Sequence, residues 1–283
     1  MNPWIIAIRP KTLTIALAVI VLAHSLAYQL CGTLNWLIAA MSSLCCISLQ
    51  MAVNMANDYF DGLNGIDNER RLGPPRVLQA GLLRPRKLFS GLMLVTLIAS
   101  LSGMYLVWHG GWSFILLGLL ALAGVFAYSY GRYSIANLAL GEVAVFFYFG
   151  WLGVLGCYYL QTSTLTFELL WPASQIGLLI SAVMLVNNIR DRSNDEDHGK
   201  LTLAVRLGPG KARLLYWLLL LAPIALAWPD PNASLWLLVC LPLILWLFIM
   251  IGQRIGKDLN QQLSQTSSLV LLWSISYSIG LLI

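Results

Sequence analysis

The chain of 283 residues is poor in charge: Asp, Glu, Lys and Arg make up 10% of it, whereas 59% of its residues are hydrophobic. A typical soluble domain carries about 25% charged residues, so this composition excludes an ordinary soluble protein. The formal net charge of +5 comes from Lys and Arg in and beside the loops, and it gives no reason to expect a nucleic-acid partner. The composition instead predicts a protein that crosses the lipid bilayer several times.

The chain also lacks the usual spacings of cysteine and histidine chemistry. Its five cysteines form no Cys-x-x-Cys motif, which favours ordinary buried residues over a metal or redox role. Its three histidines show no metalloprotease or deaminase spacing. No small-residue cleavage signature follows the first apolar run, so we interpret that run as a retained membrane span and not as a signal peptide.

Long apolar runs fill most of the chain, and a helix needs about 20 apolar residues to cross the hydrocarbon core. Candidate spans cover residues 12–29, 34–56, 87–107, 112–130, 136–160, 169–188, 212–228, 234–252 and 265–283. The sequence therefore predicts an all-α integral membrane protein with nine transmembrane helices. No domain boundary is visible, so residues 1–283 are expected to form a single domain.

Lys and Arg are absent from every second loop. The loops near residues 30–34, 108–111, 161–168 and 229–233 contain none of the seventeen, which all lie in or beside the alternate segments. Because Lys and Arg collect on the cytoplasmic side, this pattern predicts nine spans with a cytoplasmic N-terminus. We expect a multi-pass protein of the cell inner membrane, with its long loops in the cytoplasm.

Two polar stretches at the ends of the second and sixth runs share one spacing. Among their amide and acidic residues, the candidate ligands are Asn57, Asp58, Asp61 and Asp67 in residues 57–67, and Asn187, Asp191 and Asp195 in residues 187–197. An Asn and an Asp four positions apart lie on one face of a helix. Either stretch alone is typical of a solvated helix end, but the repeated spacing indicates two halves of one site and a possible internal pseudo-repeat.

Oxygen ligands of this kind suit Mg²⁺, which takes one or two carboxylates together with substrate phosphates. Each stretch leads into a long loop with several Arg and Lys residues, which donate to phosphate oxygens. The sequence therefore predicts a Mg²⁺-bridged diphosphate site in which Asp61, Asp191 and Asp195 are catalytic. A diphosphate at a membrane surface indicates a substrate with a polar head and a lipid tail, such as an isoprenyl diphosphate.

Several motifs resemble the UbiA superfamily of intramembrane aromatic prenyltransferases, and in particular its MenA-type branch, which prenylates 1,4-dihydroxy-2-naphthoate. These motifs are Arg9-Pro10-Lys11-Thr12-Leu13, Asn57-Asp58-Tyr59-Phe60-Asp61, Gly65-Ile66-Asp67, Arg71-x-Gly73-Pro74, Asn187-Asn188-Ile189-Arg190-Asp191 and Gly199-Lys200-x-Thr202-Leu203. The resemblance runs through essentially the whole chain. It implies a helical bundle around a central cavity with cytoplasmic cap loops. It also implies Mg²⁺ as cofactor and the transfer of a polyprenyl group from its diphosphate to the naphthoate, with loss of the carboxyl group.

The resemblance also implies roles for individual residues. The implied magnesium and diphosphate residues are Asn57, Asp61, Asn187, Asp191 and Asp195, with Asp58 and Asp67 as further contributors. Many members carry an acid four positions after Asp61, whereas this chain has Gly65 there and places the acid at Asp67. Tyr128 and Arg132 resemble a Tyr-x-x-x-Lys element that contacts diphosphate, with Arg in place of Lys.

Other residues are expected to hold the two substrates. Arg76 and Lys200 are candidate donors to the diphosphate, and Arg9 is a candidate partner for the carboxylate of the acceptor. Glu142 lies inside the fifth span, where an ionisable residue faces either a cavity or a polar partner. We therefore expect Glu142 either to line the acceptor pocket or to form a structural pair. Of the aromatic residues 146–151, only some can face the cavity.

Three other hypotheses remain open. The acceptor could be 4-hydroxybenzoate, homogentisate or a related naphthoate. A CDP-alcohol phosphotransferase is disfavoured because the sequence after Asp61 and Gly62 lacks the Ala-Arg pair that such an enzyme needs. A membrane transporter is disfavoured because its polar groups usually lie near the bilayer midplane, whereas these acids lie at helix ends.

Overall fold

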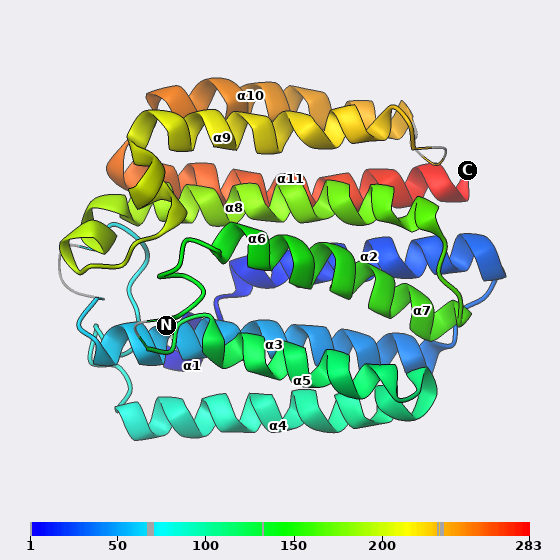
Figure 1. The fold of residues 1–283 in the computed structure, drawn as a ribbon, viewed down its shortest axis with the longest axis horizontal. Helices are drawn as coiled ribbons and strands as arrows, with labels where there is room; N and C mark the ends of the chain where they lie inside the picture. Colours follow the sequence, from blue (N-terminus) through cyan, green and yellow to red (C-terminus); the bar gives the residue numbers. More distant parts are fainter. Residues whose placement is uncertain (1, 67–70, 132, 231, 233–234) are drawn as a thin grey trace.

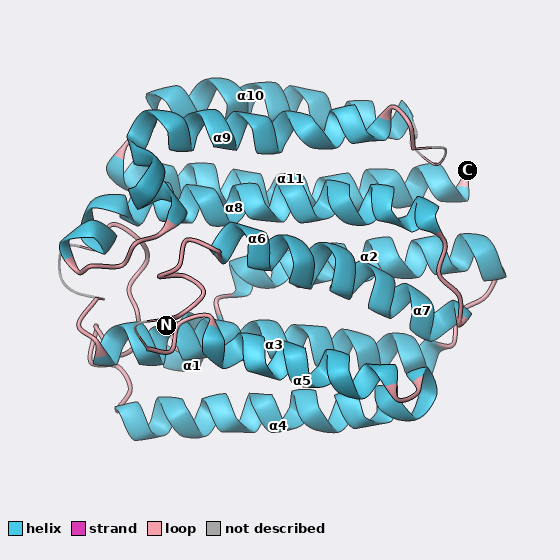
Figure 2. Cartoon of the chain, viewed as in Figure 1, coloured by secondary structure: helices cyan, strands magenta, loops and turns pink. Residues whose placement is uncertain are grey.

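The computed structural model describes residues 2–66, 71–131, 133–230, 232 and 235–283. Within these ranges the chain is helical and contains no strand (Figure 2). The α-helices are α1 (Pro3–Ile8), α2 (Pro10–Cys31), α3 (Trp36–Leu63), α4 (Pro85–Gly110), α5 (Ser113–Ala127), α6 (Gly141–Val145), α7 (Gly156–Thr162), α8 (Leu170–Asp197), α9 (Leu203–Ala227), α10 (Leu241–Gln253) and α11 (Leu259–Leu282). A π-helix, η1 (Phe146–Leu155), joins α6 to α7, and 3-10 turns lie at Phe167–Leu169, Leu235–Cys240 and Gly256–Asp258.

The long helices run side by side, as Figure 1 shows. Seven segments of the described chain are long and apolar enough to cross a membrane, which confirms an all-α, multi-pass membrane protein. Helix α5 is apolar but only 15 residues long, and α11 is rich in Ser, Thr and Gln and is not among the seven. Each of the nine expected spans coincides with one of the helical segments, but the count of nine crossings stays a prediction.

The segment that contains α8 is the most buried of the seven long apolar segments. In Figure 1 it lies with α11 between the α9–α10 pair and the layer of α2 and α6. In its most apolar stretch 72% of the residues are buried inside the protein, against 28% in the corresponding stretch of α3. One large hydrophobic cluster therefore surrounds α8, and a smaller one joins α1, α3 and α4. The second polar stretch, residues 187–197, therefore forms the C-terminal end of this most buried helix.

Two glycines allow α8 to approach η1 closely. A Cβ atom on Gly150 would come within 2.6 Å of the Ala173 carbonyl oxygen and 3.0 Å of the Gly177 Cα. A Cβ atom on Gly177 would in turn lie 2.9 Å from Cδ2 of Phe146. Only glycine at both positions permits this backbone contact, which fixes α8 against the fifth expected span.

The long loops after α3 and α8 meet at one end of the bundle, at the left of Figure 1. Asn194 Nδ2 donates to the Ile66 carbonyl oxygen at 3.0 Å, and Asn260 Nδ2, at the start of α11, donates to the Leu72 carbonyl oxygen at 2.9 Å. These contacts bring the two polar stretches of the sequence, 130 positions apart, to the same end.

Candidate active site

A cavity of about 1070 Å³ extends along the inside of the bundle. Its polar end is lined by Asn57, Asp61, Asn187, Asp191 and Asp195, and its apolar end by Ser42, Leu106, Phe114 and Leu160. Asp61 and Ser42 lie nineteen residues apart on α3, and a rise of 1.5 Å per residue gives a depth of about 28 Å. The cavity is therefore long, with polar groups at one end and apolar walls at the other.

One face of α3 supplies half of the polar end. Gln50, Asn54, Asn57 and Asp61 follow one another at intervals of three and four residues, and all four line the cavity. Asn57 Oδ1 accepts a hydrogen bond from the Ser129 hydroxyl. The Asn-x-x-x-Asp spacing thus places both side chains in the cavity, as predicted.

One face of α8 supplies the other half. Asn187, Asp191 and Asp195 recur every four residues and line the same cavity as Asn57 and Asp61. Asp61, Asp191 and Asp195 are buried, at 5%, 7% and 4% exposure. The structure therefore brings the two motifs together at one site, and the site is sheltered from bulk water.

Cationic side chains contact these carboxylates. Lys200 Nζ lies 3.0 Å from Asp61 Oδ2. Arg190 Nε and Nη2 donate to Oδ1 and Oδ2 of Asp191 at 2.8 and 2.6 Å, so this pair is bidentate. Arg71 Nη2 lies 4.0 Å from the same Asp191 Oδ2. The polar end therefore combines three acids with at least three cations.

The loop after α3 holds the two arginines in place. A Cβ atom on Gly73 would lie 2.8 Å from Arg190 Nη2 and 3.1 Å from Arg71 Nη2, so this loop position packs directly on both guanidinium groups. Arg190 Nη1 also donates to Asn260 Oδ1 at 3.0 Å, and Arg190 Nη2 to Asn187 Oδ1 at 2.9 Å. Arg190 is thus fixed by hydrogen bonds to residues of both α8 and α11.

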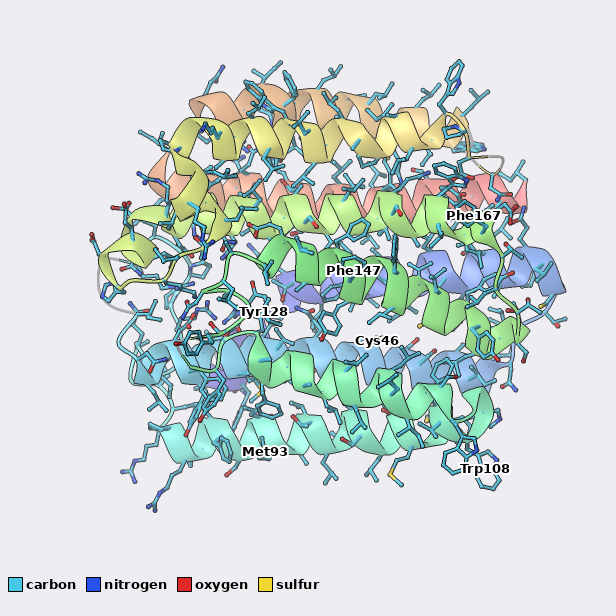
Figure 3. The ribbon with its side chains drawn as sticks, viewed as in Figure 1. Cys46, Met93, Trp108, Tyr128, Phe147 and Phe167 are labelled. Carbon is cyan, nitrogen blue, oxygen red and sulfur yellow. The ribbon has the colours of Figure 1, made fainter. Side chains whose placement is uncertain are left out.

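Arg9, Arg76, Tyr128 and Lys200, all expected to bind substrate, also line the cavity. Arg9 adopts a left-handed conformation, with φ of 52°, between α1 and α2, and its Nη2 donates to the Asn54 carbonyl oxygen at 3.0 Å. The Tyr128 hydroxyl donates to Met184 Sδ at 3.0 Å. Figure 3 shows Tyr128 toward the end of the bundle where the long loops meet, far from Trp108 and Phe167. The predicted residues Asp67 and Arg132 lie outside the described residues.

Asp58 differs from the expectation of a metal-binding residue. It follows Asn57 by one position, which turns its side chain about 100° around the helix, and it is not among the lining residues. Its carboxylate accepts hydrogen bonds from the backbone N–H groups of Val77 and Leu78 at 3.0 and 3.4 Å. The structure therefore corrects this prediction: Asp58 holds the loop after α3 against the helix.

Glu142 also lies outside the cavity wall formed by the described residues. Its Oε1 accepts a hydrogen bond from Asn188 Nδ2 at 2.9 Å, and Asn188 itself lines the cavity. The structure therefore favours the structural pair over direct contact with the acceptor. Of the aromatic run after Glu142, Tyr148 and Phe149 line the cavity.

The donor set at the polar end fits a divalent cation. Mg²⁺ prefers carboxylate and amide oxygens and completes its shell with water and substrate phosphates. Among the described residues, no three Asp, Glu, His or Cys side chains already converge on one point. Carboxylate and amide oxygens from α3 and α8 line one cavity, so the residues present fit the ligand preference of Mg²⁺.

Among the polar residues of the site, Arg71, Arg190, Gln50, Asn54 and Asn260 were not predicted from the sequence. Arg190 stands inside the second motif, so its position between Asn187 and Asp191 was the available signal. Gln50 and Asn54 lie on the same face of α3 as Asn57 and Asp61, in the preceding two turns of the helix. Helical periodicity could have predicted them. Asn260 had no local signal, because only tertiary packing brings α11 to Arg190.

Residues 15–275 match the UbiA prenyltransferase family. The chain belongs to this family. It is 37% identical to the 1,4-dihydroxy-2-naphthoate octaprenyltransferase of Haemophilus influenzae, over 100% of this chain and 96% of that protein. It is 33% identical to the protein of the same name from Mycobacterium leprae, over 96% of this chain and 94% of the relative.

Solved structures of the UbiA family share the fold. A UbiA homolog from Aeropyrum pernix K1 superposes with a TM-score of 0.71 at 18% identity, over 97% of this chain and 98% of that one. A UbiA homolog from Archaeoglobus fulgidus, described as bound to DMAPP and Mg²⁺, gives a TM-score of 0.65 at 14% identity, over 98% and 99% of the two chains. At these identities the likeness establishes the architecture and not the substrates.

Proposed function

We propose that this protein transfers a polyprenyl group from polyprenyl diphosphate to 1,4-dihydroxy-2-naphthoate within the cell inner membrane, with its polar end facing the cytoplasm. The observation that carries this proposal is the pairing of Asn57 and Asp61 with Asn187 and Asp191 at the polar end of a long apolar cavity. Such a cavity suits a substrate with an anionic head and a hydrocarbon tail. The naphthoate acceptor is supported by the names of relatives that are 33% and 37% identical over nearly the whole chain.

In this proposal Mg²⁺ would be held by Asp61, Asp191 and Asp195 together with the amide oxygens of Asn57 and Asn187. When bound, it would supply Lewis-acid stabilisation of the negative charge that develops on the diphosphate. Lys200 and the neighbouring arginines would donate N–H groups to the departing diphosphate oxygens, which favours cleavage of the allylic carbon–oxygen bond.

The cavity walls control the fate of the allylic cation that this cleavage forms. The aromatic rings of Tyr148 and Phe149 line the cavity, and aromatic faces attract such a cation. The apolar walls exclude water, which would otherwise capture the cation. The Arg9 guanidinium lies at the same cavity and would orient the acceptor carboxylate. A new carbon–carbon bond then forms at the acceptor ring, and the carboxyl group leaves as carbon dioxide.

An acceptor panel tests the proposal. Purified protein with Mg²⁺ and one polyprenyl diphosphate is offered the dihydroxynaphthoate, 4-hydroxybenzoate and homogentisate in parallel, and the prenylated products and released diphosphate are measured. We expect turnover with the dihydroxynaphthoate, dependent on Mg²⁺ and lowered by roughly 10²–10³-fold in Asp61→Asn. Turnover with another acceptor alone would replace the naphthoate in the proposal. No diphosphate release with any acceptor would refute prenyl transfer.

A further inference from the structure

The carboxylates that are proposed to bind metal already hold cationic side chains. Arg190 engages both oxygens of Asp191, at 2.8 and 2.6 Å, and Lys200 contacts Asp61 Oδ2 at 3.0 Å. The side chains of the first pair are only 3% and 9% exposed, and those of the second 14% and 8%. Both pairs are buried, so the loss of one partner would leave an uncompensated buried charge, which is costly.

A divalent cation and these side chains compete for the same oxygens. A bidentate guanidinium occupies both oxygens of Asp191 in the plane of the carboxylate, where a metal ion would also approach. Two cations at one carboxylate would also repel each other at short range. A metal ion that approaches Asp191 from the side of Arg190 therefore displaces the guanidinium, which then keeps only the amide oxygens of Asn187 and Asn260 as partners.

A diphosphate removes this obstacle, because it brings several negative oxygens into the same pocket. Arg190 and Lys200 both line the cavity, so each can move its N–H donors from a carboxylate to a diphosphate oxygen while it stays within the site. Every charge then keeps an opposite partner if the metal ion and the diphosphate bind together.

We propose that Arg190 and Lys200 are exchangeable counter-ions, which neutralise Asp191 and Asp61 until a divalent cation and a diphosphate bind together. The inference rests on the proposed function, because it takes the metal and the diphosphate as the ligands of this site. It adds that the two ligands bind with positive coupling, and by reciprocity each raises the affinity for the other by the same factor.

A fixed, orienting role for Arg190 gives the opposite expectation. If the arginine only held Asp191 in the correct rotamer for metal binding, its removal would weaken metal binding under all conditions. If it competes with the metal, its removal strengthens the binding of metal alone and weakens the effect of diphosphate. Equilibrium metal binding therefore separates the two roles without any measurement of turnover.

The experiment titrates Mn²⁺, as a spectroscopic substitute for Mg²⁺, into the purified full-length protein with and without inorganic diphosphate. Arg190→Gln removes the competing cation. The matched control is Arg192→Gln on the same helix, because Arg192 pairs with Glu196 and its side chain is 30% exposed. Arg190→Lys keeps the charge but loses the bidentate contact, and it carries the test if Arg190→Gln does not fold.

In the wild type we expect diphosphate to raise Mn²⁺ affinity by about fivefold or more. Arg190→Gln should bind Mn²⁺ alone more tightly than the wild type and gain less from diphosphate, Arg190→Lys should fall between them, and Arg192→Gln should match the wild type. Weaker or unchanged Mn²⁺ binding by the two Arg190 variants would overturn the exchange and leave the proposed function standing. A wild type that binds no Mn²⁺ in either condition would overturn both.

Discussion

The two halves of the site use one spacing in different surroundings. On α3, Asp61 is neutralised by Lys200 from a distant part of the chain, and 28% of the apolar stretch of α3 is buried. On α8, Asp191 is neutralised by the adjacent Arg190, and the corresponding stretch is 72% buried. The two motifs are therefore buried to a similar degree, with Asp61 5% and Asp191 7% exposed, although the helix that carries the second motif is more deeply enclosed.

The largest expected effects come from the two carboxylates themselves. Asp61→Asn and Asp191→Asn should each lower prenyl transfer by roughly 10²–10³-fold, because each would remove a carboxylate ligand of the Mg²⁺ that is proposed to stabilise the leaving diphosphate. The two variants should differ in their free energy of unfolding. Asp191→Asn leaves Arg190 buried without its anionic partner, which costs about 3–5 kcal/mol, whereas the more exposed Lys200 should make Asp61→Asn less costly.

Thermal unfolding of the two variants beside the wild type measures this difference. Equal losses of stability would show that the two halves are equivalent after all.

Asp58 and Asp61 lie on the same helix, but we expect a structural role for Asp58 and a metal-binding role for Asp61. Asp58→Ala leaves the backbone N–H groups of Val77 and Leu78 without their acceptor, which should cost about 1–3 kcal/mol for the buried Val77 group and less for the half-buried Leu78 group. We expect a lower unfolding temperature and an unchanged affinity for Mn²⁺. A selective loss of Mn²⁺ affinity at wild-type stability would return Asp58 to the metal site.

The close contact between α8 and η1 leaves no room for a Cβ atom at Gly150, so a larger residue there should lower the stability. In Gly150→Ala the new Cβ would meet the Ala173 carbonyl oxygen, and we expect a loss of about 1–3 kcal/mol. Gly118→Ala on α5 is the matched control, since its Cβ meets nothing within 4 Å. Unfolding in a denaturing detergent compares the two, and equal stabilities would argue against a tight crossing.

The smallest effect is expected at Glu142. Glu142→Gln keeps an oxygen that can accept the Asn188 hydrogen bond, so activity should stay within about twofold of the wild type, a difference of under about 0.5 kcal/mol. The Michaelis constant for the acceptor is the informative measurement. An increase of tenfold or more would place Glu142 in direct contact with the acceptor.

Helical periodicity made most of the polar end predictable from sequence. The apolar runs and the repeated Asn-x-x-x-Asp spacing depend on local rules, and the structure places Asn57, Asp61, Asn187 and Asp191 at one cavity. The same rule, applied strictly, would have turned Asp58 away from Asn57. The contact between Asn260 and Arg190 could not be foreseen, because it depends on how α11 packs beside the loop after α3.

The one-sided polarity of the cavity has a consequence for turnover. In the proposed reaction, a prenyl diphosphate would be retained by its charged head at the polar end, about 28 Å from the apolar end near Ser42. Once the diphosphate and the acceptor carboxyl group are lost, the lipid product carries no charge that these acids and cations can hold. We therefore expect the product to leave the cavity by partitioning into the surrounding bilayer.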